Sequence, residues 1–96
     1  MVKHIVMFKL FEKNSDNINK AILALEGMRG KIDVLKNLEV GVDYKNSECS
    51  YDIVLTTEFT NKEGLEIYAT HPLHIPVKKL LFSLCSHTTV VDYEYF

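Results

Sequence analysis

The sequence predicts an α+β domain in which the elements follow the order strand, helix, strand, strand, helix, strand. Apolar and polar residues alternate near both ends of the chain and again in its middle, as in strands with one buried face. Between these stretches, apolar residues recur every three or four positions, as on one face of a helix. No linker, repeat or low-complexity segment interrupts the chain, so we expect a single domain over residues 1–96.

The first strand is expected over residues 2–10, where the even positions, including His4, share one face. The loop after this strand ends at Ser15 or Asp16, and either residue is expected to cap the helix that follows. The buried stripe of this helix consists of apolar residues at helical spacing, namely Ile18, Ile22, Leu25 and Met28.

Two strands are then expected over residues 37–44 and 51–59, joined as a hairpin by a polar loop. Thr60 and Glu63 match a capping box, which predicts the start of the next helix. Pro72 ends or bends that helix, because the residue before a proline avoids helical geometry.

A second helical segment is expected over residues 73–84, and a last strand over residues 87–96. The buried stripe of the helical segment is formed by Val77, Leu80, Leu81 and Leu84. The resulting βαββαβ order is that of the ferredoxin-like fold, in which helices cover one face of an antiparallel sheet.

The face of the sheet that the helices leave uncovered is predicted to be too apolar for open solvent. It carries Ile5, Met7, Val54, Thr56, Val91, Tyr93 and Tyr95. A contiguous apolar patch on a small protein usually marks an interface, and two such sheets packed about a twofold axis would bury it. We therefore expect a homodimer, that is, a dimeric α+β barrel. The alternative is a half-solvated sheet with a few exposed apolar residues.

Charge and composition argue against several classes of partner. Eleven basic and thirteen acidic side chains give a net charge of −2, which predicts no nucleic-acid surface. No apolar run approaches the roughly 20 residues that span a bilayer, and the N-terminus lacks the pattern of a signal peptide. Cys49 and Cys85 are too few for a disulfide framework. A cytoplasmic protein without nucleic-acid or membrane partners is expected.

Residues 68–74 place a phenol and two imidazoles within one short segment, at the expected junction between helices. Imidazole is the only side chain whose unperturbed pKa lies near neutrality, so histidines on buried faces are candidates for proton transfer. Helical spacing puts His74 on the stripe of Val77 and Leu81, and strand alternation puts His4 on the helix side of the sheet. The polar side chains expected to meet between sheet and helices are His4, Tyr68, His74 and Asp92.

Several motifs keep the same order along nearly the whole chain. They are Val2-Lys-His-Ile-Val-Met-Phe-Lys9, Leu38-Glu-Val-Gly41, Tyr51-Asp-Ile-Val-Leu55, Tyr68-x-x-His-Pro-x-His74 and Val91-Asp-Tyr-Glu94. Together they resemble the stress-responsive A/B barrel (Dabb) domain family. The resemblance implies a dimeric α+β barrel of ferredoxin-like subunits, although most members of that family have no assigned activity.

The members with known chemistry are of the plant polyketide cyclase type, exemplified by olivetolic acid cyclase. In these proteins the second histidine of the His-Pro-x-His segment is the base of a cofactor-free aldol ring closure, and the upstream tyrosine assists. By motif, these roles fall on His74 and Tyr68, and the histidine of the first strand corresponds to His4. The cyclase has a second pocket histidine at the position of Ile53, so the resemblance implies that Ile53 contacts the ligand. Isoleucine cannot make the polar contact of a histidine, which argues against the same substrate.

The residues support the hypothesis that Asp92 orients His74, which removes a proton from an acidic carbon while Tyr68 or His4 polarises a carbonyl. His71 and His74 lie three residues apart, but no carboxylate or thiol stands at metal-ligand spacing. Neither a metal site nor a cofactor is therefore expected.

The competing hypothesis is a stress-associated dimer that binds a small ligand or has a structural role without catalysis. In that case the histidines and Tyr68 are hydrogen-bonded core residues, as buried polar groups usually are. An open cavity bordered by His74, Tyr68 and His4 favours the enzyme, whereas a collapsed interior favours the alternative. A one-residue slip of the last strand would move Asp92 to the solvent side.

Overall fold

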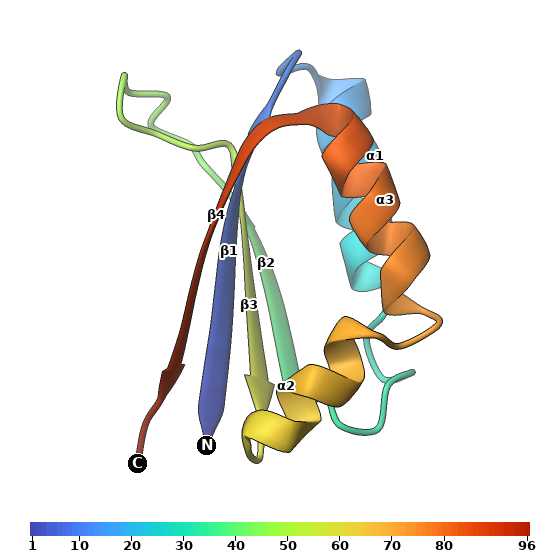
Figure 1. Cartoon of the computed structure of the whole chain (residues 1–96). Coiled ribbons are helices and arrows are strands. Elements are labelled where there is room, and N and C mark those ends of the chain that lie inside the picture. The colour runs from blue at the N-terminus through green and yellow to red at the C-terminus, as the bar shows by residue number, and fades with distance from the viewer.

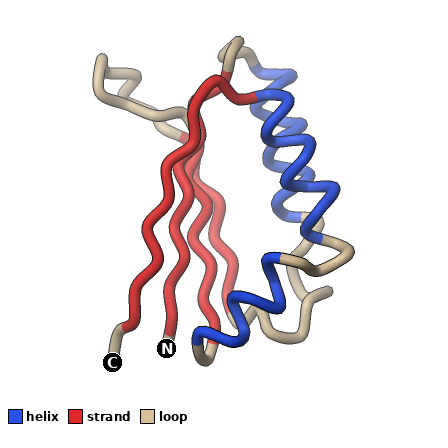
Figure 2. The backbone as a smooth tube through the Cα atoms, in the orientation of Figure 1, coloured by secondary structure: helices blue, strands red, loops and turns tan.

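A computed structural model describes residues 1–96 and confirms the ferredoxin-like βαββαβ architecture (Figure 1). Its elements are β1 (Val2–Leu10), α1 (Ser15–Glu26), β2 (Asn37–Val42), β3 (Ile53–Phe59), α2 (Lys62–Ala69), α3 (His74–Leu84) and β4 (Cys85–Glu94). The strands form one antiparallel sheet in the order β2-β3-β1-β4. Figure 2 shows the helices as a single layer on one side of this sheet, while the other side is bare. None of the helices combines the length and the apolar composition needed to cross a membrane.

The predicted alternation places the core correctly. Even positions of β1 pair with odd positions of β3, so that Val6 lies beside Leu55 on the helix side of the sheet. On the helix layer, Ala21 and Leu25 of α1 are buried against these strands. The buried apolar residues form one continuous cluster, and the chain therefore has a single hydrophobic core.

Both helix caps predicted from the sequence are wrong by a residue or two. Asn14 caps α1, since its side-chain oxygen accepts a hydrogen bond from the Asn17 amide at 2.8 Å. Asn61 caps α2 in the same way and accepts from the Gly64 amide at 2.9 Å. Asparagine, serine and aspartate are similarly good caps, so the sequence indicated the helix starts without distinguishing the capping residue.

Two further expectations change in detail. Leu80, predicted to lie in the buried stripe of α3, is exposed, whereas Leu81 of the same stripe is buried. Asp52 falls within the strand predicted over residues 51–59, and alternation would put it on the bare face with Val54. It is instead buried just before β3 and accepts a hydrogen bond from the Leu10 amide at 2.8 Å. The alternation of buried and less buried residues in β3 begins only at Ile53, because the Asp52 side chain is hydrogen-bonded to the last residue of β1.

The junction between α2 and α3 determines how the candidate site is assembled. α2 ends at Ala69 and Thr70 is its C-cap, while Pro72 keeps the residue before it, His71, from continuing the helix. The His71 ring nitrogen Nδ1 accepts a hydrogen bond from the Leu73 amide at 3.1 Å, and the His71 carbonyl accepts from the His74 amide at 2.9 Å. His71 therefore holds the turn together and brings the start of α3 next to the last turn of α2.

Candidate active site

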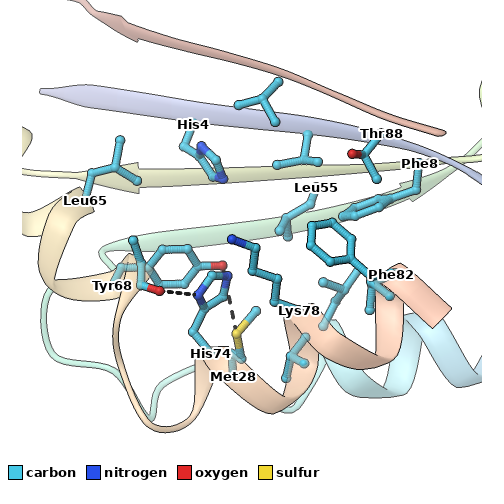
Figure 3. Close-up of a pocket in the computed structure, with 16 residues that line it drawn as sticks. His4, Phe8, Met28, Leu55, Leu65, Tyr68, His74, Lys78, Phe82 and Thr88 are labelled. Carbon is cyan, nitrogen blue, oxygen red and sulfur yellow. Dashed lines mark hydrogen bonds between the residues drawn. The ribbon is translucent and has the colours of Figure 1, made fainter. Parts of the chain in front are cut away.

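A cavity of about 240 Å³ lies between the sheet and the helices α2 and α3 (Figure 3). Twelve of the 16 residues that line it are hydrophobic, so most of its wall is apolar. The remaining lining residues are His4, His74, Lys78 and Thr88. Apolar walls with a few converging polar groups are typical of sites that bind small molecules.

The mouth of the cavity lies between α3 and β4. The exposed residues of the wall are Ala69, Lys78, Phe82, Thr88 and Val90. β4 is an edge strand, and its helix-side residues are left open, as the 53% exposure of Val90 indicates. A ligand would therefore enter over β4 and reach the buried wall formed by α1, β1 and α2.

His74 is the first residue of α3, and its ring is held by the preceding helix. Its Nδ1 lies 3.1 Å from the carbonyl oxygen of Ala69. A carbonyl can only accept a hydrogen bond, so Nδ1 carries the proton and Nε2 of the neutral ring carries the free lone pair. The ring also packs on Tyr68, with 4.2 Å between the ring centroids.

Burial lowers the pKa of His74 below its ordinary value of 6.5. The hydrogen bond to Ala69 acts in the opposite direction, and the positive charge of Lys78 lowers the pKa further. His74 is therefore a neutral imidazole at pH 7, which is the form that a general base requires.

Tyr68 is 1% exposed and lies at the inner wall of the cavity. Burial raises the pKa of its phenol well above the ordinary value of 10, so the hydroxyl stays protonated. Its only partner within the protein is the Met28 sulfur at 3.9 Å, and a thioether is a weak acceptor. The hydroxyl can therefore donate a stronger hydrogen bond to a ligand oxygen.

His4 and Asp92 form the carboxylate–imidazole pair of the site. The two residues are directly opposite each other on β1 and β4, and the Asp92 carboxylate is hydrogen-bonded to Nδ1 of His4. The predicted pair of Asp92 with His74 is therefore wrong, because His74 bonds to the Ala69 carbonyl instead. Opposite residues on paired strands are neighbours, whereas His74 reaches the cavity from the helix layer. Asp92 stands behind His4, outside the cavity wall.

Three of the five site residues predicted from the sequence line the cavity, and Asp92 and Ile53 do not. Figure 3 shows His4 entering the cavity from the sheet and Tyr68 and His74 entering from the helices. Ile53, expected to contact a ligand, does not line the cavity: it is 2% exposed and lies opposite Phe8 in the core. Ile53 lies at the start of β3, four residues before Thr57, which is the residue of β3 opposite His4. Ile53 is therefore far along the strand from the polar end of the site.

Sequence reasoning missed two polar residues of the wall, Lys78 and Thr88. Lys78 follows His74 by four residues, a spacing that places both side chains on one face of a helix. Thr88 alternates with Val90 and Asp92 and therefore faces the helices with them. Both signals were present in the sequence.

Comparison with known proteins agrees with this architecture. The family described as Stress responsive A/B Barrel Domain (Dabb) matches residues 2–95. The chain belongs to this family. This Dabb domain is 23% identical over 94 residues to a stress-response A/B barrel domain-containing protein of Arabidopsis thaliana, a match that covers 95% of this chain and 83% of that protein.

Solved structures extend the comparison. A dimeric protein of unknown function and ferredoxin-like fold from Bacteroides fragilis is 35% identical, with a TM-score of 0.85 and coverage of 98% of this Dabb domain and 95% of that chain. A hydroxynitrile lyase from Passiflora edulis has a TM-score of 0.83 at 17% identity, covering 99% of this Dabb domain and 95% of that chain. The second similarity shows a shared fold.

We predict that the pKa of His74, measured by NMR titration of its Cε1 proton, lies below 6.5, because burial disfavours the charged ring. The unfolded chain binds this proton more tightly, so His74 should lower the free energy of unfolding as the pH falls below 6.5 and through its folded pKa. The His74→Gln variant identifies the resonance and should lose this part of the pH dependence. A pKa at or above 6.5 would contradict the prediction.

Proposed function

We propose that this Dabb domain is a cofactor-free lyase or cyclase that acts on a small carbonyl compound, with Nε2 of His74 as the general base. One observation carries the proposal: a neutral imidazole, a protonated phenol and a carboxylate-backed imidazole converge on a single apolar cavity. A proton acceptor and hydrogen-bond donors that face the same small space are suited to move protons in both directions.

The proposed first step is removal of a proton from the carbon next to a carbonyl. Nε2 of His74 takes the proton, and the electron pair of the broken C–H bond moves onto the carbonyl oxygen to form an enolate. The Tyr68 hydroxyl donates a hydrogen bond to this oxygen and stabilises its developing charge. Because the wall is mostly apolar, these interactions are less weakened by water than on the surface.

His4 is the proposed proton donor of the next step. Its Nδ1 is hydrogen-bonded to the Asp92 carboxylate, which orients the ring and leaves Nε2 for the cavity. A donor at this place can protonate the oxygen that becomes negative when the enolate attacks a second carbonyl. In a lyase the same groups act in reverse, and the carbon–carbon bond breaks.

Replacing His74 by alanine is expected to slow carbon-acid exchange by roughly 10²–10⁴-fold, the usual contribution of a positioned general base. The probe is phenylacetone in D2O, and proton NMR follows the replacement of its α-protons by deuterium. His87→Ala is the matched control, since His87 is exposed on β4 and outside the cavity wall, and it should exchange at the wild-type rate. If a folded His74→Ala protein exchanges as fast as the wild type, His74 is not the base.

Replacing Tyr68 by phenylalanine tests the hydrogen bond to the enolate oxygen. The variant keeps the ring that packs on His74 and Phe59, and the hydroxyl that it loses has only a sulfur partner. We expect the melting temperature to change little, while phenylacetone exchange slows by roughly 10-fold or more, as when a donor to a developing oxyanion is lost. An unchanged exchange rate would remove Tyr68 from the mechanism.

Ligand binding without catalysis is a second candidate function. It is favoured by the hydrogen bond between His74 and the Ala69 carbonyl, which also satisfies a half-buried imidazole in a purely structural role. The two candidates differ in the exchange experiment, because a binding protein holds phenylacetone in the cavity without accelerating loss of its α-protons.

We also infer that two copies of the chain pair through the bare face of the sheet. Ile5 lies beside Thr56 on one neighbouring strand and beside Val91 on the other, so the apolar residues of this face are contiguous. Met7, Val91 and Tyr93 are exposed there. A patch of this kind usually marks an interface, and the relative from Bacteroides fragilis is described as dimeric.

We expect the wild-type protein to have a mass about twice 11.1 kDa in solution, and Val91→Glu to have the mass of a monomer. A glutamate within an apolar interface would be buried without a partner in the dimer, which is costly. Light scattering coupled to size-exclusion chromatography measures both masses. Leu23→Glu is the control, because Leu23 is exposed on α1, in the helix layer, and this variant should remain dimeric. A monomeric wild type would exclude the interface.

A further inference from the structure

We propose that Lys78 binds an anionic group of the ligand, and that this cavity therefore takes a small molecule with an apolar body and a carboxylate. The inference rests on the proposed function for the cavity as the ligand site and for the carbonyl group of the ligand. It adds a substrate class, a keto acid, and a residue that selects it.

Lys78 is the only lysine or arginine on the cavity wall, and no aspartate or glutamate lines it. The side chain leaves α3 one turn after His74, and Figure 3 shows it extending from that helix toward the space bordered by His74 and His4. Its charge is close enough to contribute to the lowered pKa of His74. A cation in an otherwise apolar cavity favours ligands of negative charge.

The ammonium group of Lys78 has no anionic partner within the chain. The ion pairs of the protein involve other residues, and Asp92, the carboxylate behind His4, is bonded to that histidine. The specific contact of Lys78 is with the ring of Phe82, whose centroid lies 5.5 Å from Nζ. This contact leaves the hydrogen-bond donors of the ammonium free for a ligand.

Thr88 stands at the same mouth on β4, and its hydroxyl makes no hydrogen bond within the protein. Thr88 of the sheet layer is therefore a second hydrogen-bond donor on the cavity wall, besides Lys78 of the helix layer. Both residues are exposed, so the charged group would keep part of its hydration, whose complete loss would be costly.

The size and lining of the cavity define the rest of the ligand. A cavity of roughly 150 Å³ lined by aliphatic and aromatic residues holds a benzene molecule. At about 240 Å³, this cavity has room for a ring with a few further atoms, and Phe8, Leu55 and Leu81 offer it an apolar surface. With the carboxylate at the mouth, a carbonyl placed further in would lie nearer to the polar groups of Tyr68 and His74 on the inner wall.

The test compares two probes of nearly the same shape, phenylacetate and phenylacetamide, which differ in charge. Binding is followed by NMR shifts of backbone amides. We expect the wild type to bind phenylacetate roughly fivefold more tightly than phenylacetamide, the size expected for one ion pair at a partly exposed site. Lys78→Met keeps the aliphatic stem and should bind both probes equally. Lys79→Met removes the neighbouring lysine, which does not line the cavity, and should keep the preference.

Equal affinities in the wild type, or a preference that persists in Lys78→Met, would overturn the inference. So would a preference lost equally in Lys79→Met, since it would then reflect overall charge. The two experiments separate this inference from the proposed base. Failure of the base appears only in the exchange of phenylacetone, whereas failure of the anion site appears only in the compared affinities for phenylacetate and phenylacetamide.

Discussion

The pairing of β1 with both β3 and β4 is the constraint on which the rest of the structure depends. It places β1 inside the sheet, so that His4 lies between Thr57 on one side and Asp92 on the other. The same pairing aligns Val6 with Leu55 under the helices and Ile5 with Val91 on the bare face. Because side chains alternate along a strand, adjacent residues of β1 serve the site and the proposed interface, and a register shift of one residue would destroy both.

Incomplete coverage of the sheet by the helices explains why a cavity exists at all. The helix layer buries the inner strands, but the helix-side residues of β4 remain exposed and form one lip of the mouth. Behind this mouth, burial keeps His74 neutral and Tyr68 protonated, since both charged forms would be poorly solvated. His74 is therefore in the neutral form that proton removal requires, and Tyr68 is in the protonated form that stabilises an oxyanion. The cationic residue of the wall, Lys78, is exposed to solvent.

The candidate chemistry is distributed over both layers, which makes it dependent on the tertiary structure. His4 is fixed by a carboxylate on the neighbouring strand, and His74 is fixed by a carbonyl at the end of α2. Each imidazole has one nitrogen occupied and the other left for the cavity. The turn around His71 links α2 to α3 and so determines the distance between Tyr68 and His74. Small changes in this turn would alter the site without touching its residues.

The sequence by itself determined the order of the elements, the face on which most strand residues lie and the inward positions of His4, Tyr68 and His74. These follow from local periodicity, because a period of two or of 3.6 residues fixes which side chains share a face. Tertiary structure alone decided that Asp92 pairs with His4, that Ile53 belongs to the core and that the mouth of the cavity lies between α3 and β4. Periodicity gives the face of each element separately, whereas these contacts depend on strand register and on where α3 docks over the sheet.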